Sequence, residues 1–250
     1  MRAEELRETY EVESRHWWFR GKRILFERLL ADRLQATGGR RLRILDVGCG
    51  AGAVSAHFSR YGDIVAADRS TAALGFTRSR GIDQVFGASA PGLPFAPESF
   101  DLILAFDVIE HVDDDRTMVA ELAASLRPGG ALAVHVPAWP SLWSRHDVLL
   151  EHKRRYTRRS LRTLLDGSGL ELEHFGWASA AILPAVAAVR GLGRLRRNGD
   201  GDDAGGQDLG DVPAPLNAAL VGLYRVEAAL AATTGLPFGL SLAAVAAKPA

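Results

Sequence analysis

The feature that most constrains this chain is a glycine-rich turn directly after a short apolar run. Residues 44–52 read Ile-Leu-Asp-Val-Gly-Cys-Gly-Ala-Gly, which predicts a buried strand, a tight turn and the start of a helix. Glycine tolerates backbone conformations that other residues avoid, and it lets a ligand approach the backbone closely. The free N–H groups at the start of a helix suit a carboxylate or a phosphate. The turn therefore predicts a ligand-binding loop.

An acidic residue stands in register with this loop. Asp68 ends the next predicted strand, 20 residues after Gly48. A carboxylate at that position can accept two hydrogen bonds from ribose hydroxyls. The combination fits the binding of NAD and of S-adenosylmethionine (SAM) alike.

Strand and helix patterns alternate along most of the chain. Such alternation predicts an α/β domain, with a parallel sheet covered by helices on both faces. Strands are expected at residues 42–47, 63–67, 85–86, 102–106, 131–136, 170–175 and 240–247. Helices are expected at residues 4–36, 53–61, 72–80, 115–126, 160–166, 178–197 and 216–232, with a loop at 138–156.

Composition narrows the class of protein. A chain of 250 residues is long enough for one decorated α/β domain. Its 30 basic and 30 acidic residues balance, which argues against a nucleic-acid partner. Cys49 is the only cysteine, so neither a disulfide framework nor a cysteine metal cluster is expected. The charged residues 1–10 and the lack of a long apolar run predict a cytoplasmic protein.

Four short motifs follow one another between residues 46 and 130. They are Asp-x-Gly-Cys-Gly-x-Gly from Asp46, Leu-Pro-Phe with Ser-Phe-Asp in 93–101, Phe-Asp-Val-Ile-Glu-His-Val in 106–112, and Leu-Arg-Pro-Gly-Gly in 126–130. Over about residues 40–175 the chain resembles the small-molecule branch of the class I SAM-dependent methyltransferases. The resemblance implies a Rossmann-like fold with a seven-stranded, mostly parallel sheet whose last strand is antiparallel.

The expected organisation is a single methyltransferase domain. Residues 1–38 would form an N-terminal helical cap and residues 40–176 the cofactor-binding core. Residues 177–239 would form a helical insert with a flexible linker at 198–212, and residues 240–248 the last strand. The insert fits a lid, a dimer interface or, least favoured, a membrane-surface contact through its arginines. Either a monomer or a homodimer is compatible with the sequence.

The resemblance also implies which residues bind SAM and its product S-adenosylhomocysteine. The three loop glycines would approach the methionyl part, Asp46 would help place the amino group, and Asp68 would bind the ribose. Ser89 stands where the family often has an aspartate for the adenine amino group, and Arg20 would pair with the SAM carboxylate. The full predicted cofactor set is Asp46, Gly48, Cys49, Gly50, Gly52, Asp68, Arg69, Ser89, Phe106, Asp107 and Arg20.

Histidines and aromatic residues mark the acceptor side. A hydroxyl acceptor gains from a general base, and histidine is the usual one; His146 and His152 are the first candidates and His111 the third. The predicted substrate-binding residues are Trp17, Trp139, Trp143, Asp147 and Tyr156. The adjacent pairs Glu110/His111 and His146/Asp147 match known metal-ligand spacing poorly, so no metal is predicted.

The predicted function is methyl transfer from SAM to a small or amphiphilic acceptor. Oxygen is favoured over nitrogen or carbon because histidines surround the expected site, and a natural product or a lipid-linked sugar would suit the apolar insert. Two alternatives stay open. One is a SAM-binding protein without methyl transfer, a cyclase or a scaffold. The other is an NAD(P)-dependent oxidoreductase, although the Tyr-x-x-x-Lys pair of short-chain dehydrogenases is absent.

Overall fold

A seven-stranded sheet forms the centre of the computed structural model, which describes residues 3–35, 38–183 and 212–250. The strands are β1 (Leu42–Val47), β2 (Gly62–Asp68), β3 (Gln84–Gly87), β4 (Phe100–Phe106), β5 (Leu126–Pro137), β6 (Glu171–Ala178) and β7 (Ser241–Ala247). Their order is β3-β2-β1-β4-β5-β7-β6. Strand β7 runs antiparallel to β5 and β6, and the other strand pairs are parallel. This confirms the Rossmann-like, mostly parallel sheet with an antiparallel last strand.

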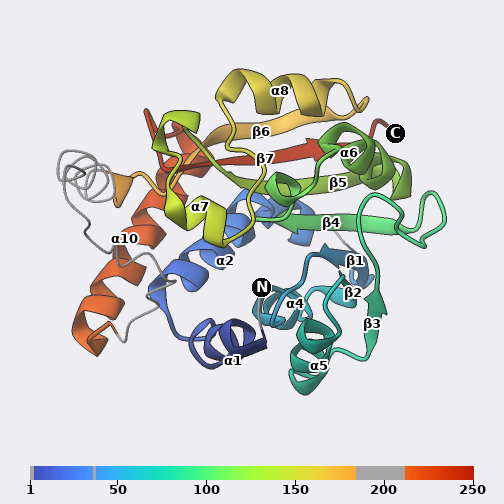
Figure 1. The fold of residues 1–250 in the computed structure, drawn as a ribbon. Coiled ribbons are helices and arrows are strands. Elements are labelled where there is room, and N and C mark those ends of the chain that lie inside the picture. Colours follow the sequence, from blue (N-terminus) through green and yellow to red (C-terminus); the bar gives the residue numbers. More distant parts are fainter. Residues whose placement is uncertain (1–2, 36–37, 184–211) are drawn as a thin grey trace.

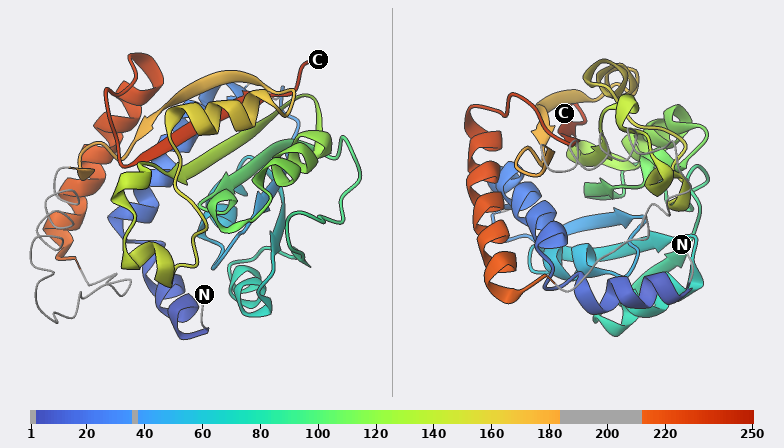
Figure 2. Two further views of the ribbon diagram at one scale, coloured as in Figure 1. Left: turned by 45° about the horizontal axis from the view of Figure 1, so that its top comes forward. Right: turned by 60° about the vertical axis from the view of Figure 1, so that its left-hand side comes forward.

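Helices cover both faces of the sheet (Figure 1). The α-helices are α1 (Ala3–Val12), α2 (Trp17–Leu29), α3 (Ala31–Gln35), α4 (Ala53–Phe58), α5 (Thr71–Ser79), α6 (Asp115–Ser125), α7 (Arg145–Leu149), α8 (Arg158–Asp166) and α10 (Ala214–Thr233). In the described part of the chain two 3₁₀ turns follow strands, η1 (Ile109–His111) and η2 (Pro140–Leu142). Helices α2 and α10 lie side by side along one face (Figure 2).

Each face of the sheet has its own apolar core, because neighbouring residues of a strand point to opposite faces. Leu45 and Ile103 pack with Met118 of α6 and Leu161 of α8. The residues beside them in β1 and β4 instead pack with a set from α2, α4, α5 and α10, which includes Phe26, Phe58, Leu74 and Ala228. The near-continuous apolar strands of the sequence thus reflect burial on both faces.

The expected single helix at 4–36 is wrong. The chain forms three helices there, and His16 marks the main break, because its imidazole accepts a hydrogen bond from the backbone N–H of Trp18 and so caps α2. Apolar periodicity continues through the break and hides it. The expected loop at 138–156 also contains two short helices, η2 and α7, and Ser144 and Asp147 form a capping box for α7.

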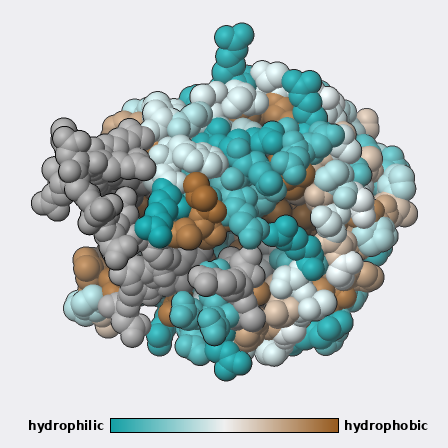
Figure 3. All heavy atoms as spheres, in the orientation of Figure 1, coloured by the Kyte–Doolittle hydropathy of each residue, from teal (hydrophilic) through white to brown (hydrophobic). Residues whose placement is uncertain are grey.

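Part of the predicted insert lies outside the described residues. This holds for residues 184–197 of the expected helix 178–197 and for residues 198–211 of the expected linker. Ala178 itself belongs to β6, so that strand runs further than expected. No helix within the described residues is both long enough and apolar enough to cross a membrane. The face seen in Figure 3 is mostly hydrophilic, with apolar groups between the polar ones.

Candidate active site

The glycine loop lies between the carboxyl end of β1 and the start of α4. Gly48, Gly50 and Gly52 all have positive φ, at 67°, 54° and 88°, a region that glycine enters without strain. A Cβ on Gly48 would lie 2.7 Å from Cγ2 of Val108, whereas a Cβ on Gly50 would meet nothing within 4 Å. The backbone at Gly50 is therefore open to a ligand.

Asp68 lies directly beside this loop. Its carboxylate accepts hydrogen bonds from the backbone N–H of Gly50 at 3.0 Å and of Ser70 at 2.8 Å. A carboxylate has about four lone-pair sites, so both oxygens keep capacity for hydroxyl donors. The geometry fits the ribose of a nucleoside cofactor.

Asp46 and Cys49 lie behind the loop. Asp46 is 2% exposed and accepts a hydrogen bond from the hydroxyl of Ser55 in α4. Burial raises the pKa of the Asp46 carboxyl to about 7. The Cys49 thiol is also buried, 3.5 Å from Oγ1 of Thr77 in α5, and burial raises its pKa. Both side chains support the loop from inside, and direct contact of Asp46 with the SAM amino group stays a prediction.

The N-terminal helices pack onto the loop through charged groups. Glu13, between α1 and α2, accepts from the backbone N–H of Ala53 at 3.2 Å and from Arg80 at 2.9 Å. Buried Arg23 donates to the backbone carbonyl of Glu13 at 2.9 Å. Arg20 is half-buried one turn earlier in α2. Burial is the main cause that lowers the pKa of Arg23, and the charge of Arg20 lowers it further. The N-terminal segment thus contacts the first turn of α4.

Asp107 follows β4 and connects three elements. Its carboxylate pairs with the Lys22 ammonium of α2 and lies 2.6 Å from Nδ1 of His135 in β5. Burial alone would raise the pKa of Asp107, but the charges of Lys22 and His135 lower it well below its usual range. The preceding residue, Phe106, stacks on Phe26 with ring centroids 4.0 Å apart. Phe106 therefore packs against α2.

The other two predicted cofactor residues are on the surface. Ser89 is exposed in the loop after β3, and the neighbouring Ala88 donates a backbone hydrogen bond to the carbonyl of Asp68 at 3.1 Å. Arg69 follows Asp68 and forms a 2.8 Å ion pair with Glu151 in the loop after α7. That pair connects the carboxyl end of β2, which carries Asp68, with the loop that carries the predicted acceptor residues.

His152 is oriented by a buried carboxylate. Its Nδ1 lies 3.0 Å from Oδ1 of Asp147, which also accepts from Nε of Arg155 at 2.6 Å. Burial alone would raise the pKa of the fully buried Asp147, yet the hydrogen bonds from His152 and Arg155 lower it. Because Asp147 engages Nδ1, Nε2 is the His152 nitrogen left to act on a ligand.

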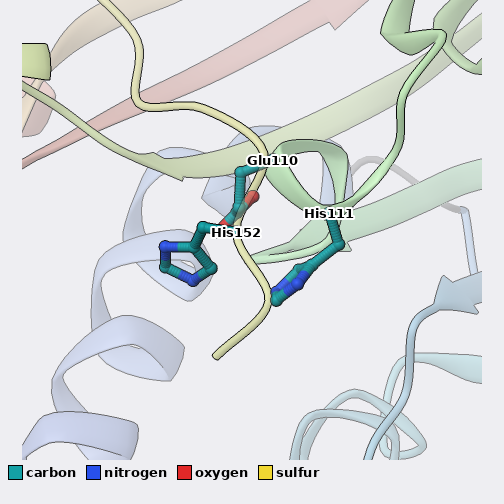
Figure 4. A group of neighbouring side chains, drawn as sticks. All are labelled: Glu110, His111 and His152. Carbon is teal, nitrogen blue, oxygen red and sulfur yellow. The ribbon is translucent and has the colours of Figure 1, made fainter. Parts of the chain in front are cut away.

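His111 and Glu110 lie beside His152 (Figure 4). The rings of His111 and His152 meet edge to face with centroids 4.8 Å apart. Burial and the neighbouring His152 lower the pKa of His111. Glu110 is fully buried, and neither of its carboxyl oxygens has a hydrogen-bond partner within the described part of the chain. Burial and the charge of Asp107 raise the pKa of Glu110 well above its usual value.

The remaining predicted residues make contacts with other elements and are buried to different depths. Trp17 contacts Tyr224 of α10, with ring centroids 5.9 Å apart. Trp139 stacks on Trp177 at 4.9 Å, and Trp143 is 38% exposed. Tyr156 is buried, and its hydroxyl donates to Asp115 at 2.8 Å, which gives it a structural role. His146 lies in α7.

Sequence reasoning missed Glu13, Lys22 and the grouping of Glu110 with His152. Glu13 and Lys22 read as ordinary charges of a helical segment, and nothing in the chain marks their partners 40 and 85 positions away. In the sequence, only its neighbour His111 pairs with Glu110. His152 joins them because the backbone N–H of Lys153 donates to the Glu110 carbonyl at 2.7 Å. Contacts of that kind exist only in the folded chain.

Comparisons with known proteins identify the family of this chain. Residues 45–134 match the family model described as a methyltransferase domain. The malonyl-[acyl-carrier protein] O-methyltransferase of Enterobacter lignolyticus is 31% identical over 179 residues, which cover 67% of this chain and 71% of that protein. The ubiquinone biosynthesis O-methyltransferase of Sinorhizobium fredii is 38% identical over 99 residues. That match covers 37% of this chain, and the chain spans only 40% of that relative's length.

Solved structures share the fold. A methyltransferase structure from Bacillus halodurans superposes with a TM-score of 0.58 at 19% identity, covering 88% of this chain and 99% of the other. Phosphoethanolamine N-methyltransferase 2 of Haemonchus contortus, in complex with SAM, gives 0.56 at 17% identity, covering 90% of this chain and 53% of the other. The oxidoreductase and non-transferase alternatives are not favoured by these matches. The glycine loop with Asp68 beside it fits SAM, and this chain belongs to the class I SAM-dependent methyltransferases.

Proposed function

We propose that this protein transfers a methyl group from SAM to a hydroxyl oxygen of a small or amphiphilic molecule. The observation that carries the proposal is the contact of 3.0 Å between Nδ1 of His152 and Oδ1 of Asp147. It lies at the carboxyl ends of the parallel strands, where the glycine loop also lies. A carboxylate acceptor is already ionised near neutral pH and would gain little from an oriented imidazole. A hydroxyl is a weak nucleophile until its proton leaves.

SAM supplies an electrophilic methyl group on a sulfonium. The chain's own residues would bind and orient it, with Asp68 at the ribose and the backbone at Gly50 against the methionyl part. The remaining cofactor predictions, among them Asp46 and Arg20, belong to this proposal. Alignment of the acceptor oxygen with the methyl group can supply much of the rate.

His152 would act on the acceptor. As the new O–C bond forms and the C–S bond breaks, the hydroxyl proton has to leave. The His152 imidazole, with Nδ1 bound to Asp147, is the group that promotes this departure. His111, whose ring contacts His152, would bind the same oxygen. Trp139 and Trp143, both partly exposed on the connection after β5, would contact the apolar part of the acceptor.

Two relatives make oxygen a reasonable acceptor. The names of the Enterobacter and Sinorhizobium proteins both describe O-methyltransferases. A natural product or a lipid-linked sugar would be the acceptor class. A cytoplasmic location, a monomeric or dimeric state and a role of the insert as a lid remain predictions of the sequence.

An acceptor panel tests the proposal. The protein would be incubated with SAM labelled in the methyl group and, separately, with catechol, methyl glucoside, a malonyl thioester and phosphoethanolamine. We expect label in a methyl ether of a hydroxyl acceptor, and much less of it with His152→Gln. Transfer only to the amine or the carboxylate, or no transfer to either hydroxyl compound while SAM binds, would contradict the proposal.

A further inference from the structure

Glu110 presents a problem that an acid–base role for His152 does not explain. Its side chain is fully buried, and within the described residues both carboxyl oxygens are without a hydrogen-bond partner. Burying a carboxyl group without a partner costs several kcal/mol or more, so a chain gains stability by avoiding it. A buried polar group without a partner calls for an explanation, and a bound ion or a catalytic role is among the explanations.

The neighbours of Glu110 are two imidazoles. One ligand atom each from Glu110, His111 and His152 lies within 4.8 Å of the other two (Figure 4). Donors bound to one ion at about 2.1 Å in a tetrahedral arrangement lie about 3.4 Å apart. Small side-chain rotations would therefore bring the three groups onto a single ion.

Asp147 supports the same interpretation. A histidine that binds a metal usually donates its other ring N–H to a carboxylate, which fixes the ring's orientation. The Asp147–His152 contact has this form, through Nδ1, and leaves Nε2 for the ion. Asp147 is itself fixed by Arg155 at 2.6 Å.

We propose that Glu110, His111 and His152 bind a first-row transition-metal dication. This inference rests on the proposed function for its role, but its evidence is separate. Two imidazoles and one carboxylate favour zinc, manganese or iron over magnesium or calcium, which prefer oxygen ligands. Three protein ligands also leave a position open, as in catalytic zinc sites.

The location suits an acceptor-binding ion. Val108, two residues before Glu110, contacts the glycine loop at Gly48. The three proposed metal ligands therefore lie next to the predicted methyl donor. A hydroxyl bound at the open position would have a lowered pKa and would lose its proton to water. Its oxygen would then attack the methyl carbon, and the C–S electron pair would stay on sulfur. His152 would thus promote proton loss as a ligand of the ion.

Calorimetric titration with Zn²⁺ tests the site directly. The full chain would be dialysed against a chelator, then against buffer, and titrated with ZnCl₂ and separately with MgCl₂. We expect one Zn²⁺ per chain, with Mg²⁺ bound at least 100-fold more weakly. Glu110→Gln and His152→Ala should each weaken Zn²⁺ binding at least 100-fold. His174→Ala, in the distant strand β6, should leave it unchanged.

Thermal melting separates the metal role from a structural one. Without metal, Glu110→Gln should melt at or above the wild-type temperature, because an amide costs less to bury than a carboxylate. Zn²⁺ should raise the melting temperature of the wild type and not that of Glu110→Gln, since a ligand stabilises only a fold that binds it. A marked loss of stability in metal-free Glu110→Gln would contradict the proposal.

Failure of this inference and failure of the proposed function would look different. If the wild type binds SAM but no Zn²⁺, or if Zn²⁺ binding survives both ligand substitutions, the metal site is wrong, and hydroxyl methylation by chelator-treated protein stands. If Zn²⁺ binds as expected but neither hydroxyl compound in the acceptor panel is methylated, the proposed function is wrong and the metal site stands.

Discussion

Gly48 of the cofactor loop and Val108 after β4 lie in such close contact that a Cβ on Gly48 would be 2.7 Å from Cγ2 of Val108. The close approach joins the glycine loop, which is predicted to bind the methyl donor, to the segment that leads to Glu110 and His111. Because Gly48 also has a φ of 67°, two independent reasons require glycine there.

Alanine substitutions in the loop should separate folding from cofactor binding. Gly48→Ala should destabilise the fold by about 2–4 kcal/mol, from left-handed strain and from overpacking against Val108. Gly50→Ala should cost only about 1 kcal/mol of strain, because its Cβ meets open space, yet it should weaken SAM binding at least tenfold. Urea unfolding and calorimetry with SAM measure both effects.

Gly129→Ala is the matched control for these two changes. Gly129 has a φ of 77° and open space around its Cβ, and it lies near the start of β5, at the opposite edge of the sheet. The variant should show the strain of Gly50→Ala with SAM affinity unchanged. Equal SAM affinity in Gly50→Ala and Gly129→Ala would mean that the backbone at Gly50 does not face the cofactor.

Asp68→Ala should weaken SAM binding about 10- to 100-fold, because hydrogen bonds to a charged group contribute about 1.5–3 kcal/mol each. Asp63→Ala offers a comparison within the same strand, since Asp63 pairs with Arg41 on the surface. Calorimetry with SAM and with S-adenosylhomocysteine should show the loss only for Asp68→Ala. Similar affinities in the two variants would contradict the assignment of Asp68 to the ribose.

His152→Gln should lower kcat by about 10²- to 10⁴-fold while the Kd for SAM stays the same. Asp147→Asn should lower kcat by about 10- to 100-fold, because it only orients His152. Asp147→Asn also leaves buried Arg155 without its carboxylate, so its melting temperature should fall. His174→Ala provides the reference with unchanged kcat. A His152→Gln enzyme with wild-type kcat would show that positioning alone drives the transfer.

Asp46 should make stability decrease with pH in a defined window. The folded-state pKa of about 7 lies above the ordinary value of 3.8, so between these pH values the unfolded chain has lost a proton that the folded chain retains. Stability should therefore fall as pH rises from about 4 to 7, by at most about 1.4 kcal/mol per pH unit. Asp46→Asn should make this slope smaller in a series of thermal melts.

Asp101→Asn should make the loss of stability at acidic pH smaller, at the other end of the same pH profile. Burial raises the pKa of Asp101, but hydrogen bonds from Arg40, Arg43 and Arg127 bring it below its usual value. Its contribution to stability is present above the unfolded-state pKa and is lost as the pH falls below it. If Asp46→Asn altered only this acidic limb, the buried Asp46 would be ionised at neutral pH and the assignment would be wrong.

The sequence by itself determined the sheet, the cofactor loop and the placing of Asp68. These depend on local signals, because an apolar run followed by glycines predicts a strand and a turn, and Asp68 closes the next strand at a fixed spacing. The capping role of His16 was missed, since periodicity continues across it.

Only the tertiary structure decided the acceptor side. His152 is 41 positions from His111 in the sequence, yet their rings are in contact, and Lys22 reaches Asp107 across 85 positions. These pairs depend on how α2 and the loop after α7 pack at the carboxyl ends of β4 and β5. Residue type and spacing carry no signal for such packing, because many positions along a chain would satisfy the same chemistry.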